Sequence, residues 1–205
     1  ASISLKADGA IQVTGSHNPP THNGFKMIMN GNVFFGDDIQ ELGIISASGP
    51  KERSGGSLKM TPIFKSYIDR LVTGADTGNY NVIWDCGNGA SGPATIAATK
   101  EISGTHTVLF GDIDGHFPNH HPNPVDPKTL AILRQSVAKA KADLGIGFDG
   151  DGDRIGIVDA KGRQVSGDLL TAFLAQDIIQ RHPGAPIILD VKSSDMAMDL
   201  IRAEG

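Results

Sequence analysis

Short apolar runs and helix-periodic stretches follow one another along the chain and divide it into alternating strands and helices. Apolar and β-branched runs of four or five residues predict strands, at 10–13, 25–29, 82–86, 107–110, 144–148, 155–159 and 186–190. Apolar positions three or four residues apart predict helices, at 37–46, 61–72, 92–102, 127–142, 167–181 and 194–204. Such alternation is typical of an α/β chain with largely parallel strand pairing.

Changes of composition predict two domain boundaries. Residues 46–59 are rich in Gly, Ser and Lys, and a second boundary is expected at 160–164, after the strand 155–159. We therefore expect the last part of a first domain in residues 1–50, a second domain in 51–160 and the beginning of a third in 161–205. Because Ala1 is not an initiator Met and a helix runs up to Gly205, we expect the chain to be a piece of a longer protein.

The most informative segment joins the predicted strands 144–148 and 155–159. It places Asp149, Asp151 and Asp153 at alternate positions, separated by glycines and followed directly by Arg154. Glycine lets the backbone curl, so the three carboxylates can converge on one cation. Ligands that are all oxygen suit Mg²⁺, and a guanidinium beside the metal can hold a phosphoryl group. The segment predicts a site for a metal and a phosphate.

Calcium-binding motifs offer an alternative explanation of this acidic segment. An EF-hand needs Gly at its sixth position and Glu at its twelfth, where this chain has Arg154 and Ala160. A calcium-binding β-helix needs tandem repeats, and the motif occurs once. Both calcium motifs are therefore excluded.

A second candidate loop follows the predicted strand 10–13. Ser16 stands between Gly15 and His17 and is followed by two prolines, so its hydroxyl would lie on a stiff, exposed turn. Taken alone, this pattern is typical of a structural turn, and there is no G-x-S-x-G motif. If the chain folds back after the prolines, Lys26 would lie near Ser16 and could act as an acid or base.

Two further segments carry chemistry-bearing side chains. The adjacent His120 and His121 have no other nitrogen or sulfur ligand nearby in sequence, so we expect them to form hydrogen bonds within a loop. The turn 85–89 is glycine-rich, but it lacks the Lys-Ser/Thr pair of a P-loop. We interpret it as a structural turn between a strand and a helix.

Composition excludes several classes of protein. The net charge of −5 gives no basic field for nucleic acid, and no apolar run approaches the length of a membrane span. The single cysteine, Cys86, excludes an intrachain disulfide and a cysteine zinc cluster, which favours a reducing cytoplasm. The oligomeric state stays open.

The two candidate loops together resemble the α-D-phosphohexomutase superfamily. The motif T-G-S-H-N-P-P, then N-G-F-K, and later G-F-D-G-D-G-D-R are similar to the phosphomannomutase/phosphoglucomutase branch. The resemblance implies repeated three-layer α/β domains with mixed, largely parallel sheets. It also implies that Ser16 is a phosphoserine that binds Mg²⁺ together with Asp149, Asp151 and Asp153. His17 and Arg154 would flank the phosphoryl group, and Lys26 would transfer a proton.

The resemblance implies an enzyme that interconverts hexose 1-phosphates and 6-phosphates of mannose or glucose through a bisphosphorylated sugar, which also serves as activator. A magnesium-dependent sugar phosphatase or phosphotransferase, a phosphoglucosamine mutase and a non-catalytic binding module are the alternatives. The family's sugar-recognition motif G-E-x-S-G-H does not occur in these residues. We therefore expect this piece alone to be inactive.

Overall fold

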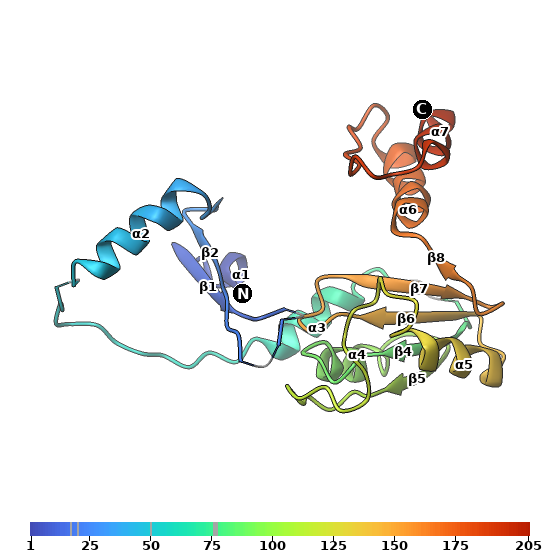
Figure 1. Ribbon diagram of the computed structural model, residues 1–205, viewed down its shortest axis with the longest axis horizontal. Coiled ribbons are helices and arrows are strands. Elements are labelled where there is room, and N and C mark those ends of the chain that lie inside the picture. Colours follow the sequence, from blue (N-terminus) through green and yellow to red (C-terminus); the bar gives the residue numbers. More distant parts are fainter. Residues whose placement is uncertain (17, 20, 50, 76–77) are drawn as a thin grey trace. The chain divides into compact units, whose positions relative to one another are not determined.

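A computed structural model describes residues 1–16, 18–19, 21–49, 51–75 and 78–205. The chain forms two compact units, Ala1–Gly74 and Ala75–Gly205. Figure 1 shows the elements of each unit, and each unit is described here by itself. No helix in the described ranges is long and apolar enough to cross a membrane.

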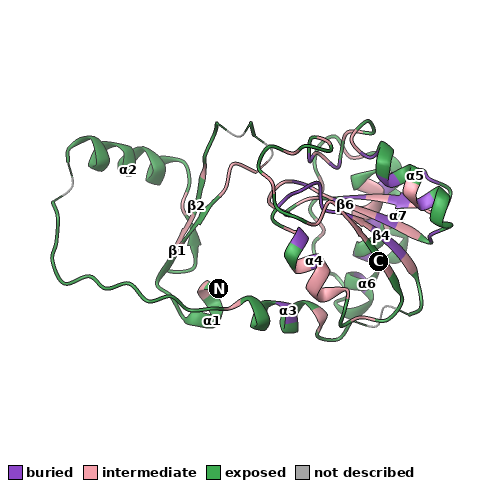
Figure 2. Cartoon of the chain, turned by 90° about the horizontal axis from the view of Figure 1, so that it is seen from below, coloured by how far each residue is buried: buried purple, intermediate pink, exposed green. Residues whose placement is uncertain are grey.

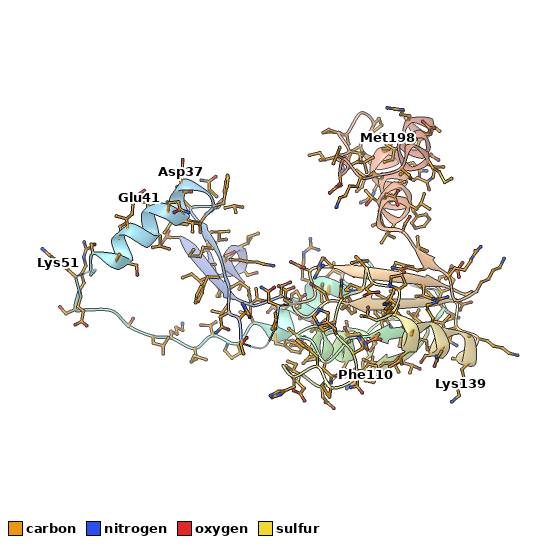
Figure 3. The ribbon with its side chains drawn as sticks, in the orientation of Figure 1. Asp37, Glu41, Lys51, Phe110, Lys139 and Met198 are labelled. Atoms are coloured by element: carbon orange, nitrogen blue, oxygen red, sulfur yellow. The ribbon has the colours of Figure 1, made fainter. Side chains whose placement is uncertain are left out.

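The first unit is built around a small antiparallel sheet. Strand β1 (Gly9–Val13) pairs with β2 (Phe25–Met29), which pairs with β3 (Asn32–Val33). The described residues of this unit also form the helices α1 (Ser2–Leu5), α2 (Asp37–Ala47) and α3 (Phe64–Val72). No residue of α2 is buried, and the side chains of Asp37 and Glu41 project from it into solvent (Figure 3).

The second unit contains a mixed five-stranded sheet with the order β5-β4-β6-β7-β8. Strand β4 (Asn81–Asp85) pairs in parallel with β5 (Thr105–Leu109) and with β6 (Leu144–Phe148). Strand β7 (Ile155–Asp159) is antiparallel both to β6 and to β8 (Gln164–Val165). Helix α4 (Gly92–Ala98) follows β4 and contacts β5, while α5 (Ala131–Ala140) packs on β4, β6 and β7.

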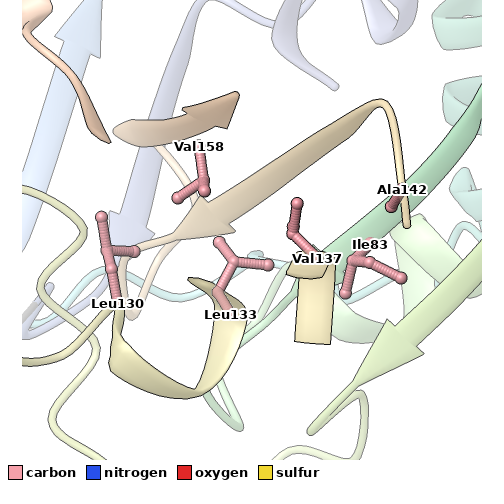
Figure 4. Packing of buried hydrophobic residues seen from close by; sticks show 6 residues of the cluster. All are labelled: Ile83, Leu130, Leu133, Val137, Ala142 and Val158. Carbon is pink, nitrogen blue, oxygen red and sulfur yellow. The ribbon is translucent and has the colours of Figure 1, made fainter. Parts of the chain in front are cut away.

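The hydrophobic core lies between α5 and this sheet. Leu133 and Val137 of α5 are fully buried and pack with four other apolar residues of the second unit, Ile83, Leu130, Ala142 and Val158 (Figure 4). Buried residues concentrate around the sheet of this unit, whereas the first unit is mostly exposed (Figure 2). The sheet of the second unit is therefore the most firmly packed support for a site.

The last part of the second unit is a pair of helices. Helix α6 (Gly167–Arg181) packs against α7 (Asp195–Glu204). Asp168, in the first turn of α6, accepts hydrogen bonds from the backbone N–H and hydroxyl of Ser194, which precedes α7. A hydrogen bond from the Ser166 side chain, together with these two from Ser194, holds the pKa of Asp168 far below its usual range.

The predicted α/β class is confirmed, with more antiparallel pairing than the alternation of strands and helices indicated. One predicted strand is wrong: residues 186–190 form no strand, and Ile188 is 91% exposed. Helices α3 and α5 begin later than predicted, at Phe64 and Ala131. The short elements α1, β3 and β8 were not predicted, because two to four residues show no periodicity.

Candidate metal and phosphate site

The acidic segment forms the loop of the hairpin between β6 and β7. The hairpin register pairs Phe148 with Ile155, and the loop is closed by a hydrogen bond from the N–H of Asp149 to the carbonyl of Arg154 (3.2 Å). Gly152 adopts a left-handed φ of 75°, a conformation that glycine accepts without steric cost. The backbone thus turns back within the segment, as the alternating glycines predicted.

This turn brings the three carboxylates together. One oxygen from each of Asp149, Asp151 and Asp153 lies within 4.8 Å of the others. Asp149 is fully buried, Asp151 is half-buried and Asp153 is exposed, so the cluster opens to solvent on one side. Among the described residues, this is the one group of three or more acidic, His or Cys side chains close enough to share an ion.

Arg154 neutralises the buried member of the cluster. Its Nε donates to Oδ2 of Asp149 at 3.0 Å, and its backbone N–H donates to Oδ1 at 3.1 Å. Its Nη2 forms an ion pair with the same Oδ2 at 3.0 Å. Its Nε also lies 3.8 Å from Oδ1 of Asp153. The predicted proximity of a guanidinium to the carboxylates is therefore present, and 35% of the Arg154 side chain remains accessible to solvent.

The donor set of the cluster fits a hard divalent cation. The three aspartates provide negatively charged oxygen ligands and no nitrogen or sulfur ligand. Such a set favours Mg²⁺ or a similar ion. The exposed side leaves room for water or phosphate oxygens, which Mg²⁺ commonly retains as ligands. The arrangement can thus place a metal and an arginine beside a phosphoryl group.

The turn between β4 and α4 supports the acidic loop from behind. The backbone N–H of Ala90 donates to the carbonyl of Gly150 at 2.9 Å. A Cβ atom at Gly89 would lie only 2.7 Å from the same carbonyl oxygen, so glycine is required for this approach. The glycine-rich turn, which we interpreted as structural, is therefore also in direct contact with the candidate site.

Sequence reasoning missed a buried ion pair at this turn. Nε2 of His120 lies 3.0 Å from both carboxylate oxygens of Asp85, the last residue of β4. The hydrogen bond to Asp85 raises the pKa of His120. His120 does form hydrogen bonds, as expected. Its pairing with Asp85 could not be predicted, because the two residues lie 35 positions apart in the sequence.

The serine loop closes the hairpin between β1 and β2. Val13 pairs with Phe25, and the N–H of Thr14 donates to the carbonyl of Gly24 at 2.9 Å. Ser16 has a left-handed φ of 53°, which is uncommon for a residue other than glycine and marks local strain. Its N–H donates to the hydroxyl of Thr14 at 2.9 Å.

Lys26 lies on β2, directly after the residue that closes this loop. It pairs in register with Gln12 and is exposed, so the chain does fold back as the proposed role of Lys26 required. His17 lies outside the described residues. Ser16 and Lys26 belong to the first unit and the acidic loop belongs to the second, so a joint site remains a prediction.

Comparison with protein families identifies relatives along the chain. Residues 1–49 match the family model of phosphoglucomutase/phosphomannomutase, alpha/beta/alpha domain I. Residues 65–162 match the model of alpha/beta/alpha domain II of the same family. Together the two models cover most of the chain.

Individual relatives carry the same names. The chain is 36% identical over 208 residues to a phosphoglucomutase of Neisseria gonorrhoeae, covering 100% of this chain and 45% of that protein. It is 36% identical over 202 residues to a phosphomannomutase/phosphoglucomutase of Pseudomonas aeruginosa strain PAO1, covering 98% of this chain and 44% of that protein. The chain thus spans less than half the length of these relatives.

A crystal structure agrees with these similarities. A phosphoglucomutase/phosphomannomutase family protein from Burkholderia thailandensis superposes with a TM-score of 0.89 at 37% sequence identity. The superposition covers 97% of this chain and 43% of that chain. Fold and sequence therefore point to the same family.

Proposed function

The chain belongs to the phosphoglucomutase/phosphomannomutase family, and on this premise we propose that it carries the phosphoryl-transfer half of a phosphohexose mutase. The enzyme would interconvert the 1-phosphate and 6-phosphate of glucose or mannose in the cytoplasm. The observation that carries the proposal is the cluster of Asp149, Asp151 and Asp153 with Arg154 beside it. Residues 1–50, 51–160 and 161–205 would belong to the first, second and third domains of the whole enzyme.

Ser16 would carry the transferable phosphoryl group. In the first half-reaction the P–O bond to the Ser16 Oγ breaks, and a new P–O bond forms to the free hydroxyl of the hexose monophosphate. The hydroxyl proton would pass to the neutral amine of Lys26, and a proton would be returned to the Ser16 Oγ, which leaves phosphorus as an alkoxide, so that the serine hydroxyl is restored. The resulting bisphosphorylated sugar turns over and returns its other phosphoryl group to Ser16, and the same compound serves as activator.

The acidic loop would hold one Mg²⁺ through single oxygens of Asp149, Asp151 and Asp153, together with an oxygen of phosphorylated Ser16. The bound ion supplies positive charge that offsets the charge on the phosphoryl oxygens. Arg154, part of whose side chain is accessible, would orient the phosphoryl group through its guanidinium N–H groups. His17, next to Ser16 in the sequence, would donate a hydrogen bond to the same phosphoryl group.

The first test is covalent labelling of the full-length protein. Treatment with a hexose 1,6-bisphosphate should add one phosphoryl group to the peptide that contains Ser16, detected by mass spectrometry. Ser16→Ala should lose both the label and mutase activity, whereas the control Ser48→Ala should keep both, because Ser48 is an exposed residue at the end of α2. Label on the Ser16→Ala protein would contradict the assignment.

Product analysis separates the mutase from a sugar phosphatase. A mutase converts a hexose 1-phosphate into the 6-phosphate without net release of inorganic phosphate, whereas a phosphatase releases inorganic phosphate in proportion to substrate consumed. The 205 residues alone should catalyse neither at the rate of the full-length protein. They lack the G-E-x-S-G-H motif that would hold the sugar hydroxyls, and positioning supplies much of the rate in such reactions.

A further inference from the structure

Asp85 and His120 form a charged pair inside the second unit. Nε2 of His120 faces the Asp85 carboxylate at 3.0 Å, and Nδ1 faces the carbonyl oxygen of His121 at 3.0 Å. A carbonyl oxygen and a carboxylate both accept hydrogen bonds. Both ring nitrogens of His120 therefore face acceptors, an arrangement that favours the protonated imidazolium. The two side chains are 13% and 1% exposed, for His120 and Asp85 respectively.

The carboxylate of this pair shapes the glycine-rich turn after β4. Oδ1 of Asp85 also accepts the N–H of Gly87 at 2.9 Å. Gly87 has a left-handed φ of 52°, and a Cβ atom there would lie 3.3 Å from the His120 ring. Two residues further on, Gly89 and Ala90 meet the carbonyl of Gly150 in the acidic loop. A continuous path of backbone contacts thus runs from the ion pair to the candidate metal loop.

The histidine reaches the same hairpin by a second route. The chain after His120 carries Pro122 and Pro124, whose side chains are fully buried. The carbonyl of Pro124 lies against β7, where a Cβ atom at Gly156 would be only 2.2 Å from it. Pro124 also lies near Gly147 of β6. The segment from His120 to Pro124 therefore contacts both strands that lead into the acidic loop.

We propose that the Asp85–His120 ion pair is a positioning device that fixes the spacing of the metal-binding carboxylates. It holds the β4–α4 turn against the acidic loop. It also holds the segment from His120 to Pro124 against β6 and β7. The hydrogen bonds of the pair go to Gly87 and to the carbonyl of His121, so the pair acts through Gly150 and through β6 and β7. The inference rests on the proposed metal site, and its test separates the two.

The test measures Mn²⁺ affinity of the whole 205-residue chain by electron paramagnetic resonance titration. Mn²⁺ is the probe because it is a hard cation that suits oxygen ligands. Asp85→Asn and His120→Gln should each weaken binding on the order of tenfold, since partners that orient metal ligands typically contribute 10–100-fold. The double variant should bind Mn²⁺ no more weakly than whichever single variant binds it more weakly, because the two residues act as one unit.

An exposed pair of the same chemistry provides the matched control. His116 and Asp114 are joined at 2.9 Å, with side chains 90% and 44% exposed. His116→Gln should bind Mn²⁺ as tightly as the original chain. A further variant, Asn119→Ala, removes a 2.7 Å hydrogen bond from exposed Asn119 to Asn88 in the same turn. It should weaken binding in the same direction while disturbing no buried charge.

Each outcome decides a separate point. If Asp151→Asn binds Mn²⁺ like the original chain, the proposed metal site itself is wrong. If Asp151→Asn abolishes binding but folded Asp85→Asn, His120→Gln and Asn119→Ala keep full affinity, the positioning role alone is overturned. If the two charge variants do not fold, as judged by circular dichroism, the affinity of Asn119→Ala decides the question. Losses that simply add in the double variant would also contradict a single positioning unit.

Discussion

The buried and exposed members of the acidic cluster should respond differently to loss of charge. In the presence of a chelator, Asp149→Asn should destabilise the second unit, whereas Asp153→Asn should not. Asp149 is fully buried, accepts hydrogen bonds from the backbone N–H and Nε of Arg154, and forms an ion pair with its Nη2. Asp153 is 52% exposed, and its Oδ1 lies 3.8 Å from Nε of Arg154. Both substitutions keep the shape of the side chain.

The size of the difference follows from burial. Removing one partner of a fully buried ion pair costs about 3–5 kcal/mol, and an exposed pair contributes about 0–1 kcal/mol. The Asp149–Arg154 pair lies between these limits, because the carboxylate is buried and the Arg154 side chain is 35% exposed. We expect Asp149→Asn to cost about 2–3 kcal/mol. Asp153→Asn should change stability by less than about 0.5 kcal/mol, because it also relieves repulsion within the cluster.

The chain contains one tryptophan, Trp84, which makes the measurement selective. It lies in β4 and stacks on Phe148, with ring centroids 6.2 Å apart and planes 7° from parallel. Its fluorescence therefore follows the sheet next to Asp149 during urea unfolding in EDTA. Equal losses of unfolding free energy in the Asp149 and Asp153 variants would refute the reasoning. Such equal losses would mean that the ion pair with Arg154 does not stabilise the folded loop.

Four further substitutions test the packing and charge of the same unit. Leu133→Ala should cost about 2–5 kcal/mol, since Leu133 is fully buried; Ile132→Ala on the same helix, 37% exposed, should cost less than about 1 kcal/mol by urea unfolding. Gly156→Ala should cost at least about 1–3 kcal/mol, because its Cβ would meet the Pro124 carbonyl oxygen at 2.2 Å; an unchanged melting temperature would contradict this contact. The raised pKa of His120 gives stability that is fully present below its ordinary pKa of about 6.5 and is lost as pH rises through the folded value. Urea midpoints measured above pH ~6.5 should therefore fall with pH, and less steeply in His120→Gln.

The sequence predicted those features that depend on neighbouring residues. Strands β2, β6 and β7 and helix α6 have the predicted boundaries, since each is a segment rich in apolar residues. The convergence of the three aspartates was also predicted, because alternation with glycine is a local signal. The Asp85–His120 pair was not predicted, because it joins residues far apart in sequence. Residues 186–190 read as a strand because they are apolar, but they pair with no strand in the described part of the chain.

The hairpin between β6 and β7 constrains the length of the acidic loop. Asp149 and Arg154 are joined across its base, and β6 and β7 continue directly from them in fixed register. One inserted residue would shift that register or bulge the loop, and a register shift of one turns every side chain of a strand to the opposite face. Residues 51–63 form neither helix nor strand. Evolutionary insertions and deletions are therefore expected in that connection, while the six-residue acidic loop keeps its length.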